Sequence, residues 1–125
     1  MNCFLGLNGA GKTNFLDAIY YLSLFKSAFN HVDQQLIRYK EPFFKVEGVF
    51  KIEEKRFKIH ASLKSGEKKS IRCNDVEYPK IAEHLGLFPV VMITPYDVDL
   101  IRDGSEDRRR FVDSIISQTD KEYLE

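Results

Sequence analysis

The sequence predicts an α/β fold, and three features of the 125-residue chain support this prediction. A glycine-rich loop near the start separates a short apolar run from an amphipathic helical pattern. Two long stretches then alternate apolar and polar residues, as antiparallel strands with one solvated face do. A second amphipathic helical pattern, rich in arginine, closes the chain. We therefore expect a loop and helix in residues 1–25, an antiparallel meander in 43–78, and a short helix, a buried strand and an Arg-rich helix in 79–125.

The glycine-rich loop reads GLNGAGKT from Gly6 to Thr13 and fits the phosphate-binding pattern GxxxxGK[ST]. The apolar run 3–5 predicts a strand before it, and a helix that fades near Leu24 is predicted after it. The glycines permit positive φ, and the helix N-terminus adds about half a positive charge. Lys12 would then reach the β- and γ-phosphates, and the Thr13 hydroxyl would bind Mg²⁺. A glycine turn that merely enters a helix would leave Lys12 and Thr13 unexplained.

Composition places the chain among ordinary globular proteins, with 43% hydrophobic and 30% charged residues and a formal net charge of zero. No apolar run approaches the roughly 20 residues that cross a bilayer, and a cytoplasmic location is expected. Cys3 and Cys73 have no CxxC or histidine spacing beside them, so we interpret them as reduced core or half-buried thiols.

The sequence pattern in the middle of the chain predicts a short helix and then the meander. Asp33 is the expected N-cap of a helix over 34–39, which a Glu-Pro step ends. The predicted strands cover 44–52, 57–63, 69–73 and 76–78.

The meander is locally basic, because residues 51–72 hold eight Lys or Arg against three Glu. Such an excess can follow a phosphate backbone, although a merely solvated face is the simpler alternative. The candidate DNA contacts are Lys55, Lys58, Lys64 and Arg109.

The last third predicts a short helix over 80–85 that stops at Gly86, and an apolar strand over 88–93 that is buried on both faces. A turn and a helical stub follow, and Ser105 is the expected N-cap of a helix that runs to about Gln118. A helical period places Arg108 in the middle of that helix's apolar face, so we expect it to meet Asp97 or Asp99, or to extend its charge to solvent.

Two separated motifs resemble the RecF family and, more broadly, the SMC-like branch of ABC ATPase heads. The first is GLNGAGKTNFLDAIYYLS, and the second is MITPYDVDLIRDGSEDRRRFVDSIIS. The resemblance implies a P-loop NTPase fold, an ABC-ATPase-like head lobe with an antiparallel β-meander and helices. It also implies a truncated lobe, because the Walker B strand, the signature motif and the catalytic acid of the family would lie beyond Glu125, and Asp97 is a poor match for that acid.

The resemblance further implies ATP and Mg²⁺ as ligands, with Thr13 on the metal. It implies DNA junctions and RecR-type mediators as partners, an ATP-dependent homodimer, and weak ATPase activity that this segment alone would lack. The nucleotide-binding residues would be Gly6, Leu7, Asn8, Gly9, Ala10, Gly11, Lys12, Thr13 and Asn14. The alternative hypothesis is a small P-loop kinase that phosphorylates a metabolite and uses Arg108–Arg110 as a lid.

Overall fold

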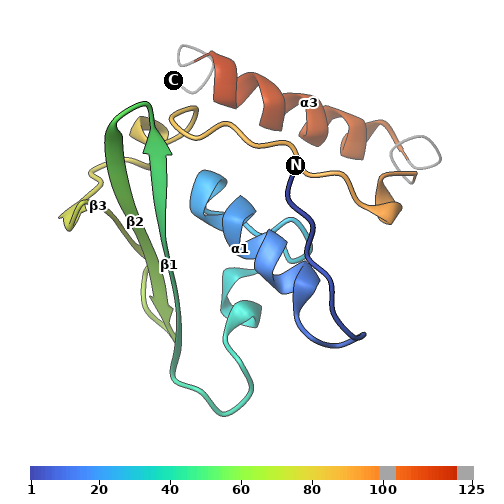
Figure 1. Cartoon of the computed structure of the whole chain (residues 1–125), viewed down its shortest axis with the longest axis horizontal. Coiled ribbons are helices and arrows are strands. Elements are labelled where there is room, and N and C mark those ends of the chain that lie inside the picture. The colour runs from blue at the N-terminus through green and yellow to red at the C-terminus, as the bar shows by residue number, and fades with distance from the viewer. Residues whose placement is uncertain (99–103, 121–125) are drawn as a thin grey trace.

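The computed structural model describes residues 1–98 and 104–120, and it places one helix against one face of a four-stranded sheet (Figure 1). Helix α1 spans Lys12–Leu24 and α3 spans Ser105–Thr119. The strands are β1 Phe43–Ile52, β2 Lys55–Lys64, β3 Ser70–Cys73 and β4 Val76–Glu77. Three short 3₁₀ helices cover Asp33–Leu36, Ile81–Glu83 and Pro95–Val98.

The sheet confirms the predicted meander, because its strands lie in the order β1-β2-β3-β4 and each pair is antiparallel. Phe44 lies opposite Leu63 and Lys51 lies opposite Arg56, so the register of the long β1–β2 ribbon is continuous from end to end. Side chains on one strand alternate between the two faces, and cross-strand partners share a face. The register therefore decides which side chains face α1 and which face solvent.

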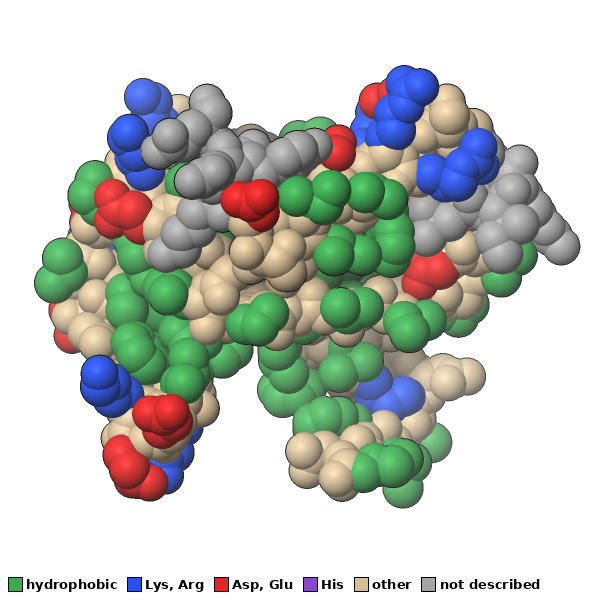
Figure 2. Space-filling model, turned by 90° about the horizontal axis from the view of Figure 1, so that it is seen from above, with side chains coloured by type: hydrophobic (Ala, Val, Ile, Leu, Met, Phe, Trp, Pro, Cys, Tyr) green, Lys and Arg blue, Asp and Glu red, His purple; other side chains and the backbone are tan. Residues whose placement is uncertain are grey.

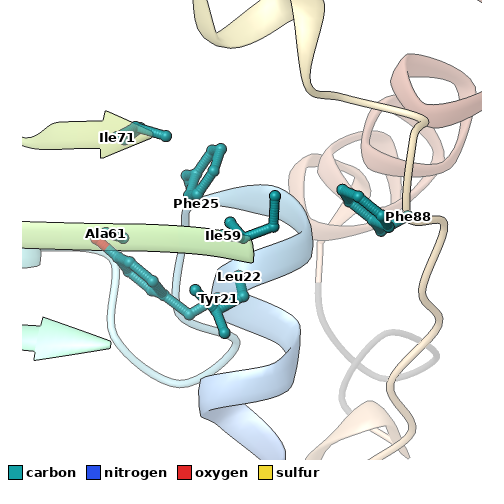
Figure 3. Packing of buried hydrophobic residues seen from close by; sticks show 7 residues of the cluster. All are labelled: Tyr21, Leu22, Phe25, Ile59, Ala61, Ile71 and Phe88. Atoms are coloured by element: carbon teal, nitrogen blue, oxygen red, sulfur yellow. The ribbon is translucent and has the colours of Figure 1, made fainter. Parts of the chain in front are cut away.

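The core lies between α1 and the inner face of the sheet (Figure 3). Its buried members come from α1 and the following turn, from β2 and β3, and from the segment after β4: Tyr21, Leu22, Phe25, Ile59, Ala61, Ile71 and Phe88. Gly48 of β1 leaves room for Leu22 of α1 to pack against the sheet, because a Cβ there would lie 2.7 Å from Leu22 Cδ1.

His84 is a core residue that the sequence pattern did not identify. Its side chain is fully buried, Nε2 lies 2.9 Å from the Leu22 carbonyl oxygen, and Nδ1 lies 3.0 Å from the Tyr78 hydroxyl. A carbonyl can only accept, so Nε2 carries the proton and Nδ1 accepts from Tyr78. Burial lowers the pKa of the imidazole, which ties α1 to the chain after β4 in its neutral form.

Lys69 makes a second link between α1 and the sheet. Its ammonium lies 2.7 Å from Asp33 Oδ2, donates to the Phe25 carbonyl, and sits 5.2 Å above the Tyr21 ring. Tyr21 also donates to Asp33 Oδ1 at 3.2 Å. The Asp33 side chain is therefore engaged with Lys69 and Tyr21 and does not cap a helix, which corrects the prediction for this residue.

Helix α3 runs along the segment that follows Phe88 (Figure 1). The Val90 amide donates to Gln118 Oε1 at 2.9 Å, and Lys26 Nζ donates to Ser114 Oγ at 2.9 Å. Gly86 has φ +84°, and a Cβ there would lie 2.4 Å from the Gln118 carbonyl oxygen. The absence of a side chain at Gly86 therefore sets how closely the end of α3 approaches.

Three predicted helix details were wrong. The helices expected over 34–39 and 80–85 are single 3₁₀ turns, Asp33–Leu36 and Ile81–Glu83. Segments this short gain too few hydrogen bonds to offset nucleation of an α-helix. The final helix forms as predicted, but Gly104 is its N-cap and Ser105 is its first helical residue.

Two predicted strands were also wrong. Residues 3–5 and 88–93 form no strand, and neither segment pairs with the sheet that the structure describes. Phe88 is buried, whereas Ile93 is 85% exposed, and Cys3 is exposed instead of packed in a core. An apolar run indicates a buried strand only if a neighbouring strand completes its hydrogen bonds, and periodicity cannot supply that neighbour. Cys73 is half-buried, as predicted.

The surface seen from above Figure 1 carries a broad group of exposed hydrophobic side chains, with Lys and Arg side chains in separate clusters near its margins (Figure 2). Exposed apolar residues include Val91 and Ile93 in the extended segment and Phe111 and Val112 on α3. No helix among the described residues is long and apolar enough to cross a membrane.

Candidate functional site

The glycine-rich loop forms a tight turn between the extended start of the chain and α1. The Ala10 amide donates to the Leu7 carbonyl at 3.2 Å, and Gly9 and Gly11 have φ +83° and +87°. L-residues with a side chain adopt this left-handed region only with strain. No atom lies within 4 Å of a Cβ built on either glycine, so the space over the loop is open and the backbone angle is the reason for glycine.

Lys12 is held by the loop that precedes it. Its Nζ donates to the carbonyl oxygens of Gly6 and Leu7, both at 2.8 Å. An ammonium has three N–H donors, so these two bonds fix the side chain across the loop and leave one donor for a further acceptor. The positive charge of Lys12 is thus positioned beside the loop residues Gly6 and Leu7.

The N-terminus of α1 adds backbone donors at the same place. The helix begins at Lys12, its N-cap Gly11 offers no side-chain acceptor, and its first turn contains no acidic residue. The first N–H groups of a helix have no intrahelical acceptor, and the helix dipole favours an anion near them. Thr13 and Asn14 are exposed at this end, so their side chains are accessible to a ligand.

The two sides of the loop are held together by an aromatic contact. The rings of Phe4 and Phe15 have centroids 4.8 Å apart and are tilted by 59°. This contact packs the chain before the loop against the first turn of α1, and it fixes the direction in which the chain enters the loop. The sequence reasoning used only the apolar character of these residues and did not identify the pair.

The loop has the groups that could hold the phosphates of a nucleoside triphosphate. The first N–H groups of α1 supply backbone donors, Lys12 supplies a fixed positive charge, and the Thr13 hydroxyl is an oxygen ligand of the kind Mg²⁺ accepts together with phosphate oxygens and water. The observation that supports this fit is the left-handed backbone of Gly9 and Gly11, with open space over both residues.

A large cleft among the described residues lies away from this loop. It has a volume of about 960 Å³ and lies between the end of α1, the segment 90–97 and α3. Tyr20, Lys26 and Ser114 contribute to its wall, whereas no residue of 6–14 does. Burial lowers the pKa of the Lys26 ammonium and raises the pKa of the Tyr20 hydroxyl. The loop residues 6–10 are exposed, so the candidate site is an open surface and not an enclosed cleft.

The structure separates the predicted DNA contacts. Lys58 and Lys64 lie on the face of β2 turned away from α1, whereas Lys55 is paired with Ile52 and belongs to the opposite face. Arg109 lies on α3, outside the sheet. The four residues predicted together therefore do not form one surface, because strand residues an odd number apart point to opposite sides.

Other residues of the outer face were not among the predicted contacts. Lys45 on β1 and Arg72 on β3 share the face of Lys58. Strict alternation along each predicted strand was the signal that could have identified them.

Arg108 does not lie on a buried face, which corrects the prediction for α3. No described residue of that helix is buried, and Arg108 itself is exposed. The expected partner Asp99 lies outside the described residues, and the Asp97 carboxylate accepts a hydrogen bond from the Thr94 amide three residues earlier. A helical period predicts a stripe of apolar residues but not whether another element covers it.

Comparisons with known proteins agree with this geometry. The family model described as "AAA domain, putative AbiEii toxin, Type IV TA system" matches residues 1–122. "DNA replication and repair protein RecF" of Phocaeicola vulgatus is 48% identical over 126 residues, which cover 100% of this chain and 34% of the relative. The RecF protein of Parabacteroides distasonis is 49% identical over 124 residues, with 99% and 34% covered. The chain thus spans about a third of the length of these curated relatives.

Solved structures show the same relationship. A structure described as that of the recombination mediator protein RecF-ATP in the RecFOR pathway has a TM-score of 0.88 and 33% identity, and the match covers 95% of this chain and 32% of that one. A structure from a study of SMC ATPases has a TM-score of 0.65 at 19% identity over 92% of this chain and 84% of that one, which supports the shared fold alone. The fold is that of a P-loop ATPase head lobe. We conclude that the chain belongs to the AAA domain family and, within it, to the RecF proteins, whose N-terminal third it matches.

Proposed function

We propose that residues 6–14 bind the triphosphate of Mg·ATP. The observation that carries the proposal is the position of Lys12, whose ammonium is fixed by two loop carbonyls beside the uncapped start of α1. The loop amides and Lys12 hold the phosphate oxygens, and the Thr13 hydroxyl contributes to the metal. A relative of known structure, at 33% identity, is described as RecF-ATP, which supports ATP as the nucleotide.

In this proposal, ATP controls the association of two copies of the whole protein on DNA. The loop residues are exposed, so this segment supplies one wall of the nucleotide site, and a second copy of the whole protein supplies the other wall. The relatives are named DNA replication and repair proteins, which supports action at single-strand and double-strand DNA junctions with RecR-type mediators, in recombinational repair and replication restart. ATP shifts such an assembly only through its different affinity for the closed and open forms.

The kinase alternative has no observation in its favour. Arg108–Arg110 lie within α3, in a regular helix, and not in a loop that could close over phosphates.

Calorimetric titration of Mg·ATP into the chain and its Lys12→Ala variant tests the proposal. A charge-assisted hydrogen bond contributes about 1.5–3 kcal/mol, so the variant should bind roughly 10- to 100-fold more weakly. Lys80→Ala, which removes an exposed lysine outside the loop, is the matched control and should bind as the unmodified chain does. Unchanged affinity in Lys12→Ala, or an equal loss in Lys80→Ala, would refute the phosphate-binding role of the loop.

A further inference from the structure

One face of the sheet is turned away from α1 (Figure 1), and the strand register places basic residues of three strands on it. We call it the outer face and define it by the odd-numbered residues of β1, the even-numbered residues of β2, and their partners on β3 and β4. Its charged residues are Lys45, Lys51, Arg56, Lys58, Lys64 and Arg72, against Glu47 and Glu77. The chain as a whole has no net charge, so this distribution is local.

We infer that the outer face binds the phosphate backbone of duplex DNA. The inference deepens the proposed function, on which it rests, by assigning a DNA-contacting surface to this segment. Lys64 and Arg56 are eight residues apart on β2, which at ~3.3 Å per residue is about 27 Å, the length of roughly eight nucleotides of one strand. Three strands at ~4.8 Å spacing make the face only about 10 Å wide, which suits one backbone.

Existing ion pairs do not block this use of the basic residues. Lys64 contacts Glu67 at 2.6 Å, Lys51 contacts Glu54 at 3.5 Å, and both acids lie in hairpin turns at the rim. Asp75, in the third turn, lies 3.8 Å from Lys58. All of these side chains are well exposed, and exposed pairs contribute only about 0–1 kcal/mol. A phosphate oxygen can replace the carboxylate at little cost.

Glu47 marks the centre of the outer face. Its Oε2 atom lies 3.4 Å from Lys45 Nζ, 3.7 Å from Lys58 Nζ and 3.6 Å from His60 Nδ1. The pKa of this carboxyl is lowered, chiefly by the hydrogen bond from Lys45. Three nitrogen groups that converge on one oxygen make a point where a phosphate oxygen is also favoured, and Glu47 competes for it.

The composition of the outer face favours duplex DNA over single strands. Single strands are bound largely by stacking their bases on aromatic side chains. Phe43 is the one Phe, Tyr or Trp at the strand positions that define the face, and it lies at the end, opposite Lys64. A surface that offers charge without stacking recognises the backbone and not the bases.

The test compares two triple variants of the full chain by fluorescence anisotropy with a labelled 20-base-pair duplex over 50–200 mM KCl. Arg56→Gln/Lys58→Gln/Lys64→Gln removes three charges from the outer face. Arg38→Gln/Lys55→Gln/Lys80→Gln removes one Arg and two Lys that are exposed but lie off that face. Each lost phosphate contact reduces the magnitude of the slope of log K against log salt by ~0.9. The magnitude of the slope should therefore fall by about 2.7 in the first variant and stay unchanged in the second.

Glu47→Gln gives a prediction of opposite sign. It removes a competing anion and frees Lys45 and Lys58, so duplex affinity should rise several-fold. Equal slopes for the two triple variants, no gain in Glu47→Gln, or equal binding of a single-stranded oligonucleotide would overturn the assignment of the outer face. Mg·ATP titration of the same variants separates the two proposals. If the outer-face variants leave DNA binding unchanged while ATP binding is normal, the assignment of the outer face is refuted and the nucleotide proposal is not.

Discussion

Gly86 should be intolerant of any side chain, because two independent costs meet at this residue. A left-handed φ costs a residue with a Cβ about 1–2 kcal/mol. In Gly86→Ala, the new Cβ would also lie 2.4 Å from the Gln118 carbonyl oxygen, so the end of α3 must move. That movement endangers the bond from the Val90 amide to Gln118 Oε1, which contributes about 1 kcal/mol. We expect a total loss of about 2–3 kcal/mol.

Gly66→Ala is the matched control, since Gly66 has φ +78° but no atom within 4 Å of a Cβ. It carries the backbone strain without the collision. For a chain of this size 1 kcal/mol shifts the melting temperature by roughly 3–5 °C, so Gly86→Ala should melt about 10 °C lower and Gly66→Ala about 5 °C lower. Circular dichroism measures both, and hydrogen exchange should quicken in α3 only for Gly86→Ala. Equal melting temperatures, or unchanged exchange in α3, would show that Gly86 does not set the approach of this helix.

Two further predictions concern the links between α1 and the rest of the fold. The pKa of His84 is lowered in the folded state by burial, so the unfolded chain binds more protons as pH falls below about 6.5, and stability present above that pH should be lost on acidification. Urea unfolding between pH 5 and 8 should show this slope in the unmodified chain and a smaller one in His84→Gln, and an unchanged slope would exclude His84 as the cause. Lys69→Met should destabilise the chain by about 1–3 kcal/mol, because it leaves the half-buried Asp33 without its cation, whereas Lys68→Met at the exposed neighbouring position should be neutral. Similar unfolding midpoints for the two lysine variants would argue against this link.

The parts of the fold that sequence predicted well are those encoded by consecutive residues. The loop from Gly6 to Thr13 is a local pattern, and it leads into α1 as expected. The four strands of the meander were predicted to within two residues at each end, because alternation and turn signals both repeat over 43–78. The final helix was predicted with Ser105 as its N-cap and an end near Gln118, and it spans Ser105–Thr119, because a helical period is also a local pattern.

The predictions that failed each required knowledge of a distant neighbour. The 88–93 run has the composition of a central strand, yet the described residues provide no strand beside it. Arg108 was placed on an apolar stripe, but no element among the described residues buries that stripe. Lys55 was grouped with Lys58 by charge, although the start of β2 puts the two on opposite faces.

The sequence by itself predicted a phosphate-binding loop at the start of the chain, and it determined the succession of loop, helix, meander and final helix, since glycine spacing and residue period act through the local backbone. Only the tertiary structure decided that Lys69 reaches Asp33, that His84 closes the core against Leu22, and that basic residues of three strands share one face. These pairs are separated by up to 62 positions, and their meeting depends on how α1 and the sheet pack. Packing is a property of the whole chain, so no local pattern contains it.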